Sequence, residues 1–247
     1  MSINRKSIYH TKNLDHDYFE KQIVNPYEST IQFFKFLNKY KPLKNKKIID
    51  LACGSGANLI YLKENFKVQR CWGFDQNNYL IKNAKKYAKH RNIKNLNFIR
   101  QDVEDLNFKK SKDLTPDGVI SIQTLSILND YEKIIRFAKN LKPNFICINS
   151  LFWEGDIDFK IAVNFLKKNK RSIVKINHYN IYSIKHYIKF LKKLGYPKIF
   201  LKKFKTNKKL KTKNKNLMGS YSIDLNHRSV IKSGPLILDW FFILATK

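Results

Sequence analysis

Three aspartates in the first half of the chain lie at or just after the ends of short runs rich in apolar side chains. These are Asp50, Asp75 and Asp102. Such runs predict buried strands, and the carboxyl ends of neighbouring parallel strands meet in one crevice. The sequence therefore predicts an acidic pocket at the carboxyl edge of a sheet. In so basic a protein, an acidic pocket favours a ligand that carries positive charge.

A glycine turn follows the first of these acids. Gly54 and Gly56 allow a tight turn and a close approach of backbone to ligand, and Asp75 comes at about the spacing of a ribose-binding acid. A dinucleotide would need a pyrophosphate site without a neighbouring carboxylate, and a third glycine where Leu59 stands. A phosphate-binding loop would need Gly-Lys-Ser or Gly-Lys-Thr after the turn. The pattern favours S-adenosylmethionine, which carries a sulfonium, an ammonium and no phosphate.

Alternating strands and helices are expected to position these residues, which predicts an α/β fold with a largely parallel sheet covered on both faces. The expected strands are 47–51, 69–75, 96–100, 117–122, 145–149, 199–204 and 240–246, and the expected helices are 18–23, 29–39, 57–65, 78–90, 130–141 and 183–194. We expect one domain over residues 1–247. Its parts are a helical cap (1–45), a cofactor-binding core (46–150) and an acceptor-side region with the last strands (151–247).

The charge of the chain allows two interpretations. The formal net charge is +30, and the run 202–215 holds eight lysines and no acid. A polyanion partner would explain this excess. However, the excess is spread over a chain rich in Lys, Asn and Ile, which favours the coding bias of an AT-rich genome. We expect the run to form a solvated loop.

The cysteines and the apolar segments predict a cytoplasmic protein. Cys53, Cys71 and Cys147 form no pair at metal-ligand or redox spacing, which favours reduced thiols. The first residues have no apolar signal core, and no apolar stretch is long enough to span a membrane. We expect no metal site, because no cluster of His and carboxylate residues has helical spacing.

The ordered motifs resemble those of class I S-adenosylmethionine-dependent methyltransferases. Segments 50–56, 102–103 and 117–121, together with Asp75, carry the resemblance, which covers 46–150 well and the remainder loosely. It implies a Rossmann-like sheet of seven strands, mostly parallel with an antiparallel last strand, and helices on both faces. Ala52 departs from the family pattern, because a glycine is usual there.

The resemblance also implies a role for each matching residue. The glycine turn would wrap the methionine part of the cofactor, Asp75 would bind the ribose hydroxyls, and Asp102 would meet the adenine amino group. Gln123 and Thr124 would line the cofactor near the reacting methyl. The cofactor-binding residues predicted in this region are Asp50, Ala52, Gly54, Gly56, Asp75, Gln76, Asp102, Val103 and Gln123.

The two ends of the chain carry a weaker resemblance. Segments 19–30 and 233–240 are similar to small-molecule methyltransferases of bacterial surface-polysaccharide gene clusters. By this resemblance the N-terminal helices fold over the cofactor. Tyr18 and Gln22 would close on its carboxylate end, and Tyr27 on its other face.

The acceptor side offers several candidates for a general base, which a hydroxyl acceptor would need. These candidates are Glu154, Asp156, His178 and His186. We predict His178 and Glu154 as the catalytic pair, although a packing role for His178 stays open. His186 is expected to be structural.

Three functions stay open from the sequence. The leading hypothesis is O- or N-methylation of a small molecule, most directly a sugar or sugar nucleotide. The second is RNA methylation with the run 202–215 as phosphate contact; no amine-binding motif follows the fourth strand, where the chain reads Ser121, Ile122, Gln123 and Thr124. The third is a non-catalytic protein that binds only the cofactor or a partner.

Overall fold

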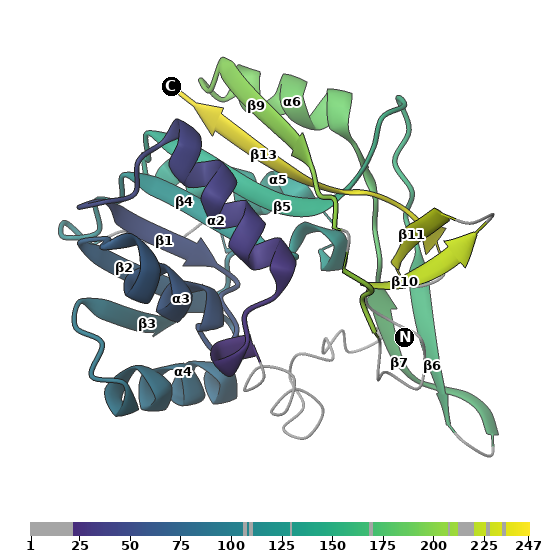
Figure 1. The fold of residues 1–247 in the computed structure, drawn as a ribbon, viewed down its shortest axis with the longest axis horizontal. Coiled ribbons are helices and arrows are strands. Elements are labelled where there is room, and N and C mark those ends of the chain that lie inside the picture. Colours follow the sequence, from purple (N-terminus) through teal and green to yellow (C-terminus); the bar gives the residue numbers. More distant parts are fainter. Residues whose placement is uncertain are drawn as a thin grey trace.

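The fold is built on a central sheet covered by helices on both faces (Figure 1). The computed structural model describes residues 22–105, 108, 111–128, 130–167, 170–206, 208–211, 220–225, 228–233 and 236–247. The strands of the sheet, in spatial order, are β3 (Leu96–Arg100), β2 (Arg70–Asp75), β1 (Lys47–Leu51), β4 (Gly118–Ile122), β5 (Phe145–Trp153), β13 (Trp240–Thr246) and β9 (Lys198–Lys203). The short strand β8 (Tyr182–Ser183) adds to β5.

The strand directions confirm the predicted mixed sheet. Neighbouring strands from β3 to β5 are parallel, and β13 runs antiparallel to both β5 and β9. All seven residues of β13 are buried, because this strand lies between β5 and β9 and not at an edge. Its uninterrupted apolar sequence is what a strand covered on both faces requires.

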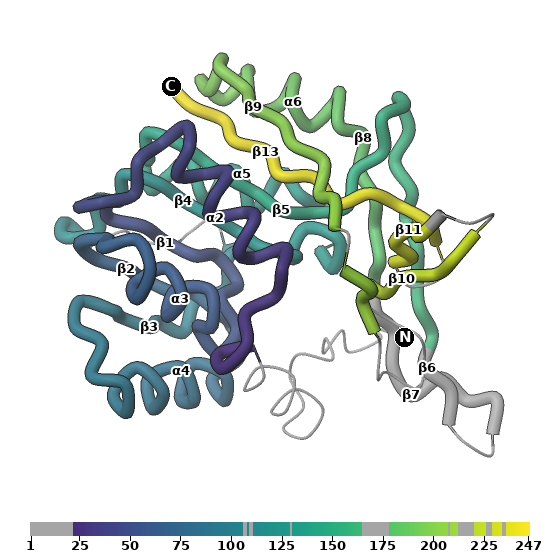
Figure 2. Tube along the Cα trace, viewed as in Figure 1, coloured from purple at the N-terminus to yellow at the C-terminus, as the bar shows by residue number. Residues whose placement is uncertain are grey.

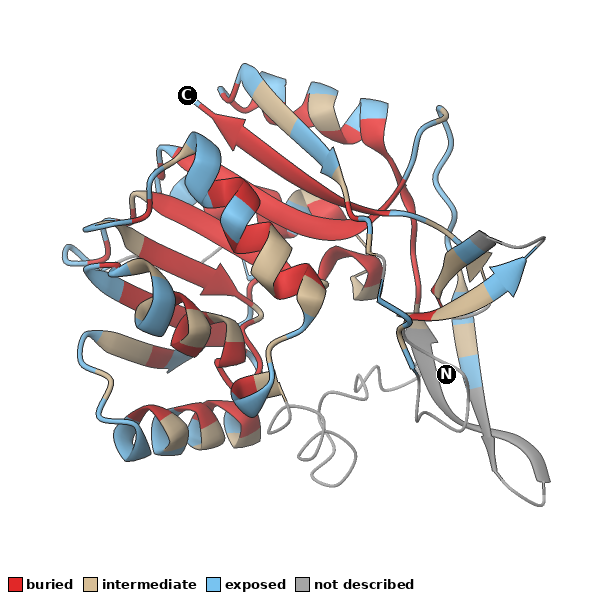
Figure 3. Ribbon diagram, viewed as in Figure 1, coloured by how far each residue is buried: buried red, intermediate tan, exposed pale blue. Residues whose placement is uncertain are grey.

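The helices cover the two faces in separate groups. Side chains of α2 (Glu28–Tyr40), α3 (Ala57–Phe66) and α4 (Asn78–His90) pack on one face, and those of α5 (Tyr131–Asn140) and α6 (Ile184–Lys193) on the other. Buried and exposed residues alternate along these helices, as Figure 3 shows for α2 and α4. Three helices begin at a side chain that accepts backbone N–H groups. These N-caps are Asn77, Asp130 and Ser183.

Beyond β5 the structure contains strands that the sequence did not predict. β6 (Ala162–Lys167) and β7 (Lys170–His178) form an antiparallel hairpin, and β10 (Ser220–Leu225), β11 (Arg228–Ser233) and β12 (Leu236–Ile237) form a second small sheet. Figures 1 and 2 place both on the side of the central sheet toward which β1 and β5 run. The carboxyl edge therefore faces added β-structure.

The basic run is not a loop throughout, which corrects the expectation for residues 202–215. Residues 202 and 203 belong to β9. The side-chain amide of Gln32 on α2 donates to the carbonyl of Lys205 at 2.9 Å. The N–H of Leu210 donates to the hydroxyl oxygen of Ser222 on β10, and the N–H of Ser222 donates to the carbonyl of Leu210. Residues 212–215 lie outside the described part. Within that part, no helix has the length and apolar character needed to cross a bilayer.

The ring of Phe242 joins β13 to α2 and is a direct test of this packing. It is fully buried and contacts the rings of Phe33, Phe36 and Phe204 at centroid distances of 5.7, 5.9 and 6.1 Å. We expect Phe242→Ala to lower the free energy of unfolding by about 3–5 kcal/mol, measured by urea denaturation. Leu201→Ala, on a side chain that is 47% exposed, should lower it by less than about 1 kcal/mol. Equal losses in the two variants would contradict the packing described.

Candidate functional site

The turn between β1 and α3 is held in a left-handed backbone conformation at three of five positions. Ala52, Gly54 and Gly56 have φ angles of 58°, 55° and 80°. A Cβ atom at Gly56 would lie 2.4 Å from the ring of Phe98, so only glycine fits there. Ala52 adopts the left-handed conformation despite its side chain, which costs about 1–2 kcal/mol. This backbone strain falls directly after β1, at the carboxyl edge of the sheet.

Asp50 places a buried carboxylate directly before this turn. Its exposed fraction is 1%, and neither carboxylate oxygen has a hydrogen-bond partner in the structure. Burial and the nearby Asp75 carboxylate raise the pKa of Asp50 well above its ordinary value, and the neighbouring Asn58 side chain offsets only part of that rise. A buried carboxylate without partners is expensive unless a cation or donor joins it.

The segment before α2 and the first turn of α2 contact the start of α3, next to the glycine turn. The hydroxyl of Thr30, in the first turn of α2, lies 3.3 Å from the amide oxygen of Asn58 on α3, which directs the amide nitrogen of Asn58 away from Thr30. Ile23 packs on Ala57 and Ile60 at the start of α3. Ile23 therefore brings the chain before α2 against the start of α3, which directly follows the glycine turn. Gln22 is next to Ile23, and Tyr18 lies outside the described residues.

Asp75 is fixed at the ends of β1 and β2 by backbone donors. One carboxylate oxygen accepts the N–H of Gly54 at 2.9 Å, and the other accepts the N–H of Asn77 at 2.8 Å. Asp75 is 8% exposed. These bonds tie the second acid to the glycine turn and fix the plane of its carboxylate at the sheet edge.

A hollow of about 640 Å³ opens beside Asp75, beyond β2 and β3. Gln76 and Asp102 line it, and the carboxylate of Asp102 accepts the N–H of Glu104 at 2.9 Å. Val103 is buried in the apolar cluster beneath. The residues that line the hollow are Gln76, Asn77, Asn78, Tyr79, Arg100, Gln101, Asp102 and Asp105.

The end of β4 contributes a second strained residue. Gln123 has a φ of 60°, and its N–H donates to the carbonyl of Asn149 on β5 at 2.8 Å. Thr124 follows and is buried. The parallel pairing of β3, β2, β1 and β4 thus brings the predicted cofactor residues to one edge of the sheet.

The candidate bases are not gathered at one point. Glu154 is 70% exposed and pairs with Lys203 at 3.5 Å, and Asp156 pairs with Lys185. His178 ends β7 opposite Ala162 and is half-buried. His186 is exposed on α6. Among the described residues, no group of three His, Cys, Asp or Glu side chains is arranged to hold a metal ion.

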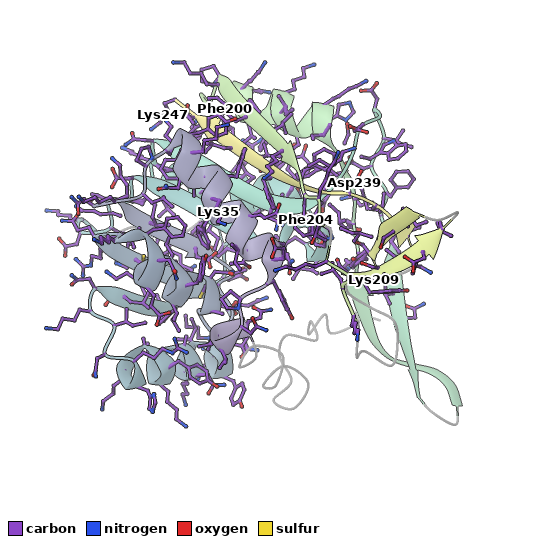
Figure 4. The ribbon with its side chains drawn as sticks, in the orientation of Figure 1. Lys35, Phe200, Phe204, Lys209, Asp239 and Lys247 are labelled. Carbon is purple, nitrogen blue, oxygen red and sulfur yellow. The ribbon has the colours of Figure 1, made fainter. Side chains whose placement is uncertain are left out.

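Several cations of the basic run are paired with acids. Lys203 contacts Asp239 at 2.9 Å, Lys208 contacts Glu28 at 2.9 Å, and Lys209 contacts Asp224 at 2.8 Å. Figure 4 shows Asp239 near the start of β13 and Lys209 close to β10. These pairs satisfy part of the positive charge within the protein and weaken the case for this segment as a phosphate contact.

Sequence reasoning missed Asn58 and Asn149. Asn58 is the second residue of α3 and gave no signal apart from its place after the glycine turn. Asn149 ends the segment predicted as the fifth strand, and only its polar character in an otherwise apolar run distinguished it. Asn149 lies beside the end of β4 because of strand pairing that a local sequence pattern does not contain.

Comparison with known proteins places this geometry in a family. A family model described as a methyltransferase domain matches residues 42–216. Similar solved structures include the DhpI–SAM–HEP complex, with a TM-score of 0.58 and 12% identity over 97% of this chain and 94% of that one. A SAM-dependent methyltransferase from Clostridium acetobutylicum has a TM-score of 0.53 and 13% identity over 93% and 97%. The YcgJ protein from Bacillus subtilis has a TM-score of 0.55 and 10% identity over 88% and 98%. Identities this low show a shared fold only. A search of curated proteins finds no significant match.

The burial of Asp50 predicts a pH-dependent effect on stability. Its folded pKa is raised above the ordinary value of 3.8, so the penalty is absent below that pH and grows as pH rises toward the folded pKa. We expect Asp50→Asn to raise the free energy of unfolding at pH 7 by on the order of 1–2 kcal/mol, with the gain shrinking toward pH 4. Urea denaturation at several pH values measures this. Asp113→Asn, at an exposed position, should change little, and a pH-independent effect of Asp50→Asn would contradict the assignment.

Proposed function

We propose a function from one premise, that the chain belongs to the methyltransferase domain family. It is an enzyme with the Rossmann-like methyltransferase fold. The proposed reaction transfers the methyl group of S-adenosylmethionine to a small-molecule acceptor. The acceptor we propose is a sugar or sugar nucleotide, methylated on oxygen or nitrogen.

The observation that carries this proposal is the unpartnered, buried carboxylate of Asp50. The cofactor carries an ammonium and a sulfonium, and a positive charge nearby would offset the burial of Asp50. The other residues fit the rest of the molecule. Asp75, already oriented by Gly54, would accept the ribose hydroxyls, and Asp102 in its hollow would accept the adenine amino group.

When bound, S-adenosylmethionine supplies an electrophilic methyl group with a good leaving group. The residues of the protein then have mainly to bind and orient. The glycine turn brings backbone close to the ligand, and the strained Gln123, tied to Asn149, fixes the backbone where β4 ends. The segment before α2, where Ile23 packs on the start of α3, would help to exclude water from the same edge.

A hydroxyl acceptor would also lose a proton. We propose that the imidazole of His178 accepts it, since His178 precedes the buried Tyr179 and is only half-buried. Glu154 is a weaker candidate, because it is largely exposed and engaged with Lys203. Tyr18 and Gln22 remain proposed contacts to the carboxylate end of the cofactor.

The remaining parts of the proposal concern location and alternatives. A cytoplasmic location is consistent with three cysteines that are buried and free. RNA methylation is less supported, because lysines 203, 208 and 209 have acidic partners. No observation favours a non-catalytic role.

Cofactor binding tests the proposal through Asp75. We expect isothermal calorimetry to show binding of S-adenosylmethionine to the wild type and a loss of affinity of about 100-fold in Asp75→Asn, because two ribose hydroxyls lose an ionised acceptor. Asp113→Asn is the matched control and should bind as the wild type does. If a well-folded wild type binds no cofactor, or if Asp75→Asn binds as tightly, the proposal fails.

Methyl transfer to a panel of nucleotide sugars tests the acceptor and the base. For an acceptor that is methylated on a hydroxyl, we expect His178→Gln to lower kcat by about 100-fold or more, with the calorimetric affinity for S-adenosylmethionine unchanged. Transfer by the variant at the wild-type rate would remove His178 from the mechanism.

A further inference from the structure

Asn149 on β5 is a second buried polar side chain without partners. Its exposed fraction is zero, and neither the oxygen nor the nitrogen of its amide has a hydrogen-bond partner in the structure. Such orphaned groups are rare in native proteins, and each needs an explanation. Asn149 is not used by the cofactor residues described above, except through its backbone carbonyl.

Asn180 shows what a structural asparagine looks like in the same protein. It is 1% exposed, and its amide nitrogen donates to the carbonyl of Leu128 at 2.7 Å. Its amide oxygen accepts the N–H of Ile161 at 3.1 Å. The two side chains are equally buried, but the amide of Asn180 forms hydrogen bonds through both its oxygen and its nitrogen, whereas the amide of Asn149 forms none. A purely structural role does not explain Asn149.

Strand register places Asn149 on the same face of the sheet as Asp50. Asp50 pairs with Ile120, Ile120 pairs with Cys147, and Asn149 lies two residues beyond Cys147 on β5. Paired residues of parallel strands point to the same face, as do residues two apart. From strand spacing and rise per residue, Asn149 lies about 10 Å across the sheet from Asp50 and about 7 Å further toward the carboxyl edge.

The surroundings of Asn149 are those of the covered edge. Its backbone carbonyl accepts the N–H of Gln123 at 2.8 Å, and its strand neighbour Phe242 contacts Phe33 of α2. In spatial order, the edge therefore presents Asp102 just after β3, Asp75 at the end of β2, Asp50 in β1, Gln123 just after β4 and Asn149 in β5. The proposed cofactor runs from its adenine at Asp102 to its reacting end near Gln123. The strand that follows β4 in the sheet is β5, so the acceptor would meet the reacting end of the cofactor beside β5.

We propose that Asn149 is a specificity-determining residue whose side-chain amide holds a hydroxyl of the acceptor beside the reacting methyl. An amide both donates and accepts, and so does a hydroxyl, so one polyhydroxylated acceptor satisfies both orphaned atoms. This inference rests on the proposed function and narrows it to acceptors of the sugar class. Ser150, the next residue, is equally buried and unpartnered but points to the opposite face.

The experiment compares Asn149→Ala and Asn149→Leu with Ser150→Ala and Asn180→Ala. The probes are UDP-glucose, UDP-galactose and GDP-mannose, with methyl transfer as the readout. Calorimetry with S-adenosylmethionine and the unfolding temperature of each free protein are measured in parallel. Two variants at position 149 are needed because Ala leaves a cavity and Leu adds volume.

For the best probe we expect both Asn149 variants to raise KM by about 10- to 100-fold, with cofactor affinity within about twofold of the wild type. Their unfolding temperatures should stay near or above that of the wild type, since an orphaned amide is removed. Ser150→Ala should keep the wild-type KM, and Asn180→Ala should unfold at a lower temperature.

Other results would overturn the inference. A fall in unfolding temperature in both Asn149 variants as large as in Asn180→Ala would make Asn149 structural. A loss of cofactor affinity would assign it to the cofactor. If the wild type binds S-adenosylmethionine but methylates no probe, the sugar acceptor of the proposed function fails. The role of Asn149 is then tested by the two measurements that need no acceptor, which are the unfolding temperature and the affinity for S-adenosylmethionine.

Discussion

The carboxylate of Asp50 is enclosed at the centre of the sheet edge without a hydrogen bond. Folding places it there because β1 is buried between β2 and β4, so a polar residue near its end has no route to water. The chain keeps this acid at a position where burial and the neighbouring Asp75 carboxylate both raise its pKa. The glycine turn follows it directly in the chain, and the proposed binding of a cationic ligand at this edge would explain why its burial is tolerated.

The order of the strands arranges polar residues on both sides of Asp50 in a fixed sequence along the sheet edge. From β3 to β5 the strand ends present carboxylates, then a strained glutamine, then an unpartnered asparagine. A ligand lying along this edge from β3 to β5 would first meet Asp102 and Asp75, which can accept hydrogen bonds from its amino and hydroxyl groups. It would then meet the buried carboxylate of Asp50 on β1, near the middle of the edge. The strain at Ala52 and Gln123 falls just after β1 and β4, where backbone geometry would set the position of the proposed ligand.

Much of this edge follows from sequence, because it depends on local patterns. Alternating strand-like and helix-like runs predicted β1 to β5 and α3 to α6 within a few residues, and Gly54 and Gly56 predicted the tight turn after β1. The hairpin β6–β7 and the sheet β10–β12 were missed because Lys and Asn interrupt their apolar pattern and backbone pairing defines them. The significance of Asn149 and the ion pairs of the basic run depend on which distant strands are neighbours, which a local pattern does not contain.

A crystal structure of the protein with S-adenosylmethionine tests the central claim most directly. The account predicts the adenine in the hollow beside Asp102, the ribose hydroxyls within hydrogen-bond distance of Asp75, and the sulfonium end between Asp50 and Gln123. The acceptor side would then face Asn149. A cofactor bound in the opposite direction along this edge, or bound away from the carboxyl ends of β1, β2 and β4, would contradict the account.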